Sequence, residues 1–158
     1  MFKLIKNNFT YVIIITAGIL FYSCSNNPIT APANGDLLFE KPGLVDSAVV
    51  NGCYAYLRRY FPDTLNLSAY NKIKVEFNGN ANSDGTSFTV LYNTNSTSNV
   101  EVYYAQDEAG VNKDHSFEFA KPDNTTWLEL RFYINPPVCG TGEFKYIRGR
   151  DLKIYGIK

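Results

Sequence analysis

Four aromatic or charged side chains stand at alternate positions of the segment TWLELRFYI. They are Trp127, Glu129, Arg131 and Tyr133. Because successive side chains of a β-strand point to opposite faces, this spacing predicts a strand that carries all four on one exposed face. Aromatic rings stack on the apolar face of a sugar, and charged planar groups hydrogen-bond to its hydroxyls. The pattern therefore favours a carbohydrate-binding surface.

The segment CYAYLRRYF could widen that surface. It alternates in the same way, and its outward row is predicted to be Tyr54, Tyr56, Arg58 and Tyr60. Aromatic neighbours and Glu–Arg pairs also stabilise exposed sheet faces without a ligand, and an N-terminal segment could bury Trp127. Tyr and Arg are favoured at protein interfaces too. A ring-lined groove would favour a sugar, whereas a flat patch would favour a protein partner.

The body of the chain consists of short β-rich segments separated by Gly, Pro, Asn and Asp, without a sustained helical period. This pattern predicts an all-β protein with an antiparallel β-sandwich. The predicted strands are Leu37–Glu40, Cys53–Phe61, Lys72–Asn78, Ser87–Tyr92, Val100–Gln106, Ser116–Phe119, Trp127–Ile134, Glu143–Ile147 and Asp151–Ile157.

Alternation also predicts which side chains face the core. In KIKVEFN they are Ile73, Val75 and Phe77, and in TWLELRFYI they are Leu128, Leu130, Phe132 and Ile134. In CYAYLRRYF the charged Arg59 falls on the inward side. We therefore expect that strand either to end at Arg59 or to contain a bulge.

Two phrases, LNLSAYNKIKVEFNG and the terminal IRGRDLKIYGIK, resemble the galactose-binding-like jelly rolls of many carbohydrate-binding modules. The resemblance covers residues 37–158 and implies a jelly roll whose last strand lies beside the first. It also implies a carbohydrate as the ligand. Related jelly rolls often hold a structural calcium between those two strands, and Asp36, Glu40 and Asp151 could supply oxygen ligands for it. We expect no other cofactor.

The N-terminus has the features of an export signal. Lys3 and Lys6 precede the apolar run Tyr11–Tyr22, which is shorter than the roughly 20 residues of a membrane-spanning helix. Ser23 and Cys24 follow it directly. This arrangement resembles the lipobox of bacterial lipoproteins, in which the cysteine is acylated and becomes the new N-terminus. A signal anchor or an ordinary secretory peptide is the alternative.

The lipobox resemblance divides the chain into three parts. Residues 1–23 would be a cleaved signal peptide, residues 24–36 a lipidated flexible tether, and residues 37–158 the β-sandwich. It places the protein in the bacterial cell envelope, anchored to a membrane by lipid, at the outer membrane or cell surface rather than the inner membrane. If Cys24 carries the lipid, Cys53 and Cys139 remain as a pair, and an oxidising compartment favours a disulfide between them.

Composition and isolated residues narrow the possible functions. The 15 Lys and Arg residues balance the 15 Asp and Glu residues, which argues against nucleic-acid binding. We expect no catalysis, because His115 stands alone in a predicted loop and Arg131 should lower the pKa of Glu129, unlike that of a general acid. The expected function is non-catalytic carbohydrate binding. The alternatives are a structural or assembly lipoprotein that binds an envelope protein and, less favoured, a small glycoside-active enzyme.

Overall fold

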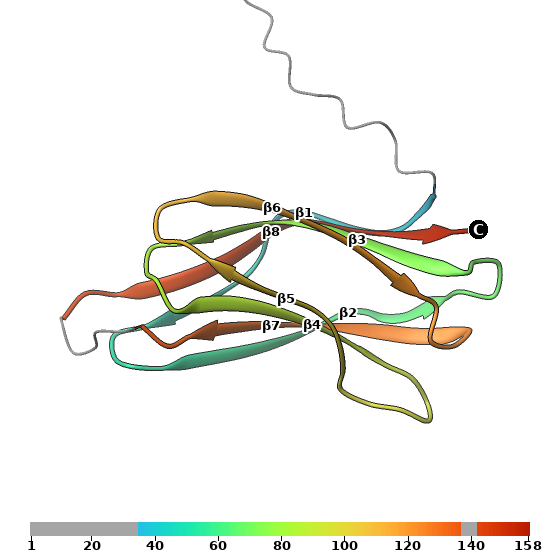
Figure 1. Cartoon of the computed structure of the whole chain (residues 1–158), viewed down its shortest axis with the longest axis horizontal. Helices are drawn as coiled ribbons and strands as arrows, with labels where there is room; N and C mark the ends of the chain where they lie inside the picture. Colours follow the sequence, from blue (N-terminus) through green and yellow to red (C-terminus); the bar gives the residue numbers. More distant parts are fainter. Residues whose placement is uncertain (1–34, 137–141) are drawn as a thin grey trace, which may run out of the picture. The chain divides into compact units, whose positions relative to one another are not determined.

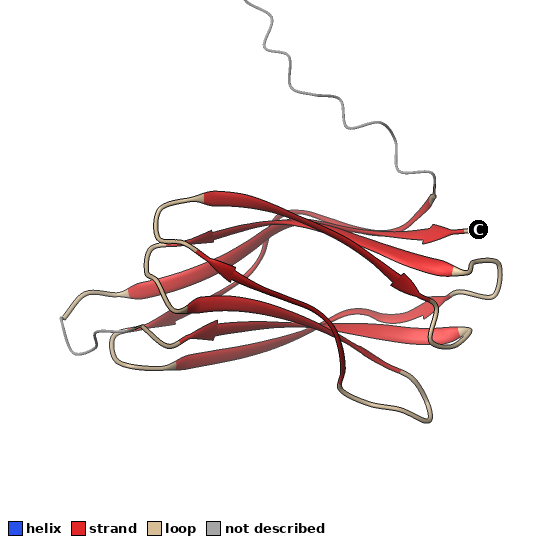
Figure 2. Ribbon diagram, viewed as in Figure 1, coloured by secondary structure: helices blue, strands red, loops and turns tan. Residues whose placement is uncertain are grey.

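The computed structural model describes residues 35–136 and 142–158, and this part of the chain contains eight β-strands and no helix (Figure 2). The strands are β1 (Asp36–Val50), β2 (Ala55–Asn66), β3 (Lys72–Ala81), β4 (Thr86–Asn93), β5 (Val100–Asp107), β6 (Asn112–Ala120), β7 (Thr125–Ile134) and β8 (Lys145–Ile157). Among these described residues there is accordingly no helical segment able to span a membrane. The predicted signal peptide, Cys24 and Cys139 lie outside them, so the predicted lipid and disulfide stay predictions.

The strands form two antiparallel sheets that pack face to face (Figure 1). Sheet A has the order β1-β8-β3-β6, and sheet B has the order β2-β7-β4-β5. An eight-stranded double sheet with this exchange of strands between layers is a jelly roll. The predicted all-β sandwich is therefore confirmed, as is the pairing of the last strand with the first.

The core between the sheets is built from the side chains that alternation predicts. Ile73, Val75 and Phe77 of β3 are buried, and so are Leu128, Leu130, Phe132 and Ile134 of β7. The Phe132 ring packs edge-on against Phe88, with ring centroids 5.3 Å apart. One face of sheet B is thus apolar and packs in the core, and the side chains at the alternate positions lie on the outer face.

The prediction of nine strands was wrong, because two predicted C-terminal strands form one, β8. Asp151 has a φ of 52° and introduces a bulge rather than a turn. Its Oδ1 atom accepts a hydrogen bond of 2.7 Å from the Gly43 backbone. The first strand is longer than predicted for a similar reason. Pro42 and Gly43 lie within β1, where an edge position and a register shift accommodate them.

The positions of Arg59 and His115 differ from those predicted. β2 continues past Arg59, and its irregularity comes later, between Phe61 and Leu65. Arg59 instead forms an ion pair with Asp46 of β1, across the edge where the two sheets meet. His115 lies within β6 rather than in a loop, and it is buried.

The two ends of the described chain lie close together. Asp36 at the start of β1 and Lys158 after β8 form an ion pair of 3.1 Å. In Figure 1 this end of the sandwich is on the right, whereas the connection between β3 and β4 is on the left. β1 finishes and β2 begins at the left-hand end, and Tyr54 directly precedes β2 in the chain.

Candidate functional site

The outer face of sheet B contains a groove with a volume of about 540 Å³. Its floor is β4, where the outward side chains are the short Ser87 and Thr89. Longer side chains of β7 form one wall, and longer side chains of β5 form the other. Tyr54 and Asn135 lie at one end of the groove, and Glu101 lines it towards the β4–β5 loop.

The first row across the groove pairs an aromatic ring with an amide. Ser87 lies opposite Tyr133 on one side and Gln106 on the other. The Tyr133 ring stacks on Tyr56 of β2 with a centroid distance of 4.7 Å and an interplanar angle of 28°. Since that distance equals the usual spacing of neighbouring strands, about 4.8 Å, the two rings stand upright side by side. The second face of Tyr133 is therefore turned towards Ser87 and the groove.

The second row pairs a guanidinium with an aromatic ring. Thr89 lies opposite Arg131 on β7 and Tyr104 on β5. Tyr104 is 52% exposed, and its hydroxyl accepts a hydrogen bond of 3.1 Å from the Gln106 side chain. Ring and polar group have thus exchanged walls relative to the first row.

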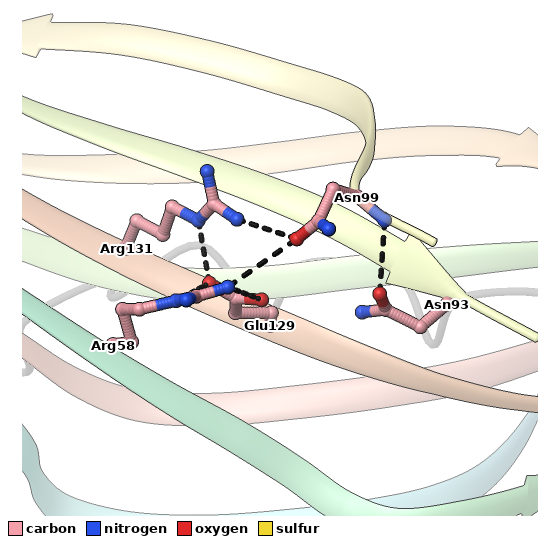
Figure 3. Close-up of polar contacts among 5 residues, drawn as sticks. All are labelled: Arg58, Asn93, Asn99, Glu129 and Arg131. Atoms are coloured by element: carbon pink, nitrogen blue, oxygen red, sulfur yellow. Dashed lines mark hydrogen bonds and ion pairs between the residues drawn. The ribbon is translucent and has the colours of Figure 1, made fainter. Parts of the chain in front are cut away.

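Glu129 holds Arg131 in place through an ion pair on the same face of β7 (Figure 3). Its carboxylate is fully buried and accepts hydrogen bonds from Arg58 Nε at 2.6 Å, Arg58 Nη2 at 3.0 Å and Arg131 Nε at 2.5 Å. Burial raises the pKa of Glu129, but the two guanidinium groups outweigh it, and the net pKa is lowered. Hydrogen bonding to Glu129 raises the pKa of both arginines. Two cations share one anion, so the cluster keeps a net positive charge.

Asn99 holds the same cluster from the β4–β5 loop. Its Oδ1 atom accepts from Arg131 Nη2 at 2.7 Å and from Arg58 Nη2 at 3.3 Å. The Asn99 backbone has a φ of 58°, a conformation that asparagine tolerates, and its N–H donates to Asn93 Oδ1 at 2.9 Å. The remaining terminal nitrogen of Arg131 contacts neither Glu129 nor Asn99 (Figure 3). Hydrogen bonding to Glu129 and also to Tyr133 raises the pKa of Arg131, so its guanidinium is held in place at the groove.

The structure brings together part of the predicted surface. Tyr54, Arg131 and Tyr133 line the groove, and Tyr56 supports Tyr133 from behind. Arg58 lies one strand further out, opposite Arg131, as part of the ion cluster. These residues do share the outer face of sheet B, as their alternation predicts.

Two of the predicted residues do not contribute to the groove directly. Glu129 is on the outer face but is not exposed, and Arg58 and Arg131 both hydrogen-bond to its carboxylate. Trp127 is half-buried opposite Asn93 and is not among the described residues that line the groove.

Sequence reasoning missed the floor and the β5 wall, namely Ser87, Thr89, Glu101, Tyr104 and Gln106. One signal was present in TSFTVLYN, where small polar residues alternate with Phe88 and Val90. That alternation predicts a strand with a flat polar face. β5 follows β4 directly in the chain, but β7, which forms the other wall, comes two strands after β5. The groove therefore becomes apparent only when the strand order is known.

The three candidate calcium ligands lie apart, each with another partner. Asp36 accepts from the Tyr70 hydroxyl at 3.0 Å, and its pKa is lowered mainly by Lys158 and then by Tyr70. Glu40 lies 3.6 Å from Lys153, and Asp151 accepts from a backbone N–H. Within residues 35–136 and 142–158, no three His, Cys, Asp or Glu side chains gather as a metal site would require.

A second buried polar cluster lies inside the sandwich. His115 Nε2 is 3.1 Å from Asp107 Oδ1, and its Nδ1 is 2.9 Å from the Tyr103 hydroxyl. Both the His115 and the Asp107 side chains are fully buried, and the imidazole stacks on Phe77 at 4.6 Å. Gly79 leaves room for this pair, since a Cβ there would collide with it. This cluster is part of the interior between the two sheets.

Comparisons with known proteins add little to this geometry. A scan against models of protein families and a search of curated proteins both give no match. Among solved structures, the chain is similar to the insecticidal delta-endotoxin Cry8Ea1 from Bacillus thuringiensis, with a TM-score of 0.44 and 13% identity. The similarity covers 72% of this chain and 20% of the toxin chain, so this protein corresponds to about a fifth of the toxin's length. The ligand of the groove is therefore argued from its own residues.

Proposed function

We propose that this protein binds carbohydrate, without catalysis, in the groove on the outer face of sheet B. The observation that carries the proposal is the composition of the groove: each of its two walls contains a tyrosine, and its floor consists of short hydroxyl side chains. Its volume of about 540 Å³ lies within the range usual for ligand sites. A groove of this kind supports a sugar over a protein partner, which would favour a broad flat patch.

The chemistry of the lining suits a polyhydroxylated ring. The free face of Tyr133 offers a stacking platform, and the fixed guanidinium of Arg131 donates to hydroxyl oxygens. Glu101 accepts from sugar hydroxyls, while Ser87 and Thr89 can both donate and accept.

Hydrolysis of a glycoside needs two carboxyl groups with different pKa values, one on each side of the bond. Glu101 is the one residue with a carboxylate among the described residues that line the groove. Glu129 is enclosed by arginines, and its lowered pKa is opposite to that of a general acid. These features support binding rather than catalysis.

The test is binding of the purified protein to a panel of immobilised polysaccharides, with Tyr133→Ala beside the wild type. We expect saturable binding that the substitution weakens by about tenfold or more. Tyr60→Ala is the matched control, because Tyr60 is 49% exposed on the same sheet and is not among the described lining residues. Absence of binding across the panel by a folded protein would overturn the proposal and favour an envelope protein as the partner.

The cell-envelope location is also a proposal, supported by the lipobox-like sequence that ends at Cys24. A lipid on Cys24 would keep captured glycan at the membrane. Bacteria that express the full chain should incorporate labelled palmitate into the wild type but not into Cys24→Ser. Equal labelling of the two proteins would contradict the anchor without affecting the binding proposal.

A further inference from the structure

The two rows across the groove repeat the same pair of chemical groups on opposite walls. In the first row the ring, Tyr133, belongs to β7 and the polar group, Gln106, belongs to β5. In the second row the ring, Tyr104, belongs to β5 and the polar group, Arg131, belongs to β7. A ligand that follows β4 therefore meets an aromatic ring first on one side and then on the other.

The spacings suit sugar rings that stand between the walls. The walls are two strands apart, or about 9.6 Å, and the rows are two residues apart, or about 6.6 Å. A ring stacked at about 4 Å from one wall leaves its far face within reach of the polar side chain opposite. Each row is thus a subsite for one pyranose, and the two subsites are consecutive.

We propose that the groove holds two consecutive sugars of a linear glycan whose successive rings are turned over by half a turn, an inference that rests on the proposed carbohydrate function. Cellulose and chitin chains have this geometry. In such a chain the same apolar face of each sugar points to alternate sides. That face meets Tyr133 in one subsite and Tyr104 in the next. In a helical chain, such as that of maltotetraose, the same face of each successive sugar stays on one side. Such a chain would stack on one of the two tyrosines alone.

The walls are held in place before any ligand arrives. Tyr56 backs Tyr133, the Gln106 amide contacts the Tyr104 hydroxyl, and Glu129 with Asn99 immobilises Arg131. Preorganised groups lose little conformational entropy on binding. The alternation of rings along the groove is therefore a fixed property of the site.

The decisive comparison is calorimetric titration of the purified protein with cellotetraose and chitotetraose against maltotetraose. Cellotetraose and maltotetraose both consist of glucose and differ in how successive rings are joined. We expect at least one of the first two to bind about tenfold more tightly than maltotetraose, and its disaccharide more tightly than its monosaccharide. Equal or tighter binding of maltotetraose, or equal binding of monosaccharide and disaccharide, would overturn the inference while leaving carbohydrate binding intact. Failure of every glycan would instead overturn the proposed function.

Substitutions test the two subsites separately. Tyr133→Ala and Tyr104→Ala should each weaken tetrasaccharide binding by about tenfold, and Tyr104→Phe, which keeps the ring, should stay within about threefold. Tyr104 is half exposed, so its replacement opens no core cavity. Tyr60→Ala serves again as the control. Unchanged affinity in Tyr104→Ala would show that the second subsite does not exist.

Discussion

The two faces of sheet B differ in how their side chains are used, although they belong to the same strands. On β7, Phe132 points inward and is fully buried among apolar rings, whereas Tyr133 points outward and forms a wall of the groove. One step along the chain thus separates a residue that stabilises the fold from one that lines the groove. A binding surface can be built on a sheet without weakening its core.

The two buried carboxylates show the same division. Asp107 is fully buried between the sheets beside His115. Glu129 is equally buried, yet its partners Arg58 and Arg131 reach the outer surface, where they remain partly exposed. One buried carboxylate thus has partners inside the core, and the other orients two cations at the surface.

The largest effect should come from the inner face. We expect Phe132→Ala to lower the free energy of unfolding by about 4 kcal/mol, because it removes a fully buried ring and leaves a cavity. Urea denaturation of Phe132→Ala and Tyr133→Ala would measure the difference, with about 1 kcal/mol or less expected for the outward tyrosine. An equal loss of unfolding free energy in the two variants would contradict the distinction between the two faces.

A smaller loss should follow when the outer cluster is neutralised. Glu129→Gln leaves two guanidinium groups without their shared anion, and we expect a loss of about 2 kcal/mol, reduced by solvent because the Arg58 side chain is 42% exposed. Glycan affinity should fall as well, since Arg131 loses its anchor. Glu76→Gln is the matched control, because Glu76 forms a more exposed ion pair with Lys74, and its loss should be below about 0.5 kcal/mol.

The two clusters should also respond at opposite ends of the pH scale. The pKa of Glu129 is lowered from 4.5 in the folded state, so its stabilising contribution is complete above pH 4.5 and is lost as the pH falls through the lowered value. The pKa of Tyr103 is raised from 10.0, first by burial and then by Asp107, so its contribution is complete below pH 10.0 and is lost as the pH rises through the raised value.

Stability measured by urea denaturation across this pH range should therefore fall at both ends. Glu129→Gln should flatten the acidic decline, and Tyr103→Phe should flatten the alkaline one. An acidic decline of unchanged steepness in Glu129→Gln would assign it to other carboxylates, such as Asp36, whose pKa is also lowered.

The smallest effect is expected at Trp127, one of the four residues in the outward row that the sequence predicts. Trp127→Ala should change glycan affinity by less than about twofold, because Trp127 does not belong to the described groove lining. The measurement is titration with the best-binding tetrasaccharide. A large loss would extend the site beyond the two rows and towards Asn93.

Alternation along single strands was enough to predict the sandwich, the inward residues of β3 and β7, and the outward rows that contain Tyr54 and Tyr133. These features depend on local spacing, which the sequence displays directly. The continuity of β8 through Asp151 could not be predicted in this way. A local break is tolerated there because the paired strand β1 supplies Gly43 as a hydrogen-bond donor.

The groove could be predicted only in part, for a related reason. Its floor and second wall depend on β4 lying between β7 and β5, which is a property of strand order. The position of the Arg131 guanidinium depends on Asn99, which lies in a loop 32 residues earlier in the chain. Neither the strand order nor the contact of Asn99 produces a periodic pattern of residues in the sequence.

The meeting of Asp36 and Lys158 at one end of the sandwich has a practical consequence. Both ends of the described sandwich lie side by side, at the end away from the connection between β3 and β4. Neighbouring termini are the arrangement in which one domain can be inserted into a surface loop of another. The sandwich could therefore be grafted into a host protein, or coupled to a solid support through either end, without a change to the strands that form the groove.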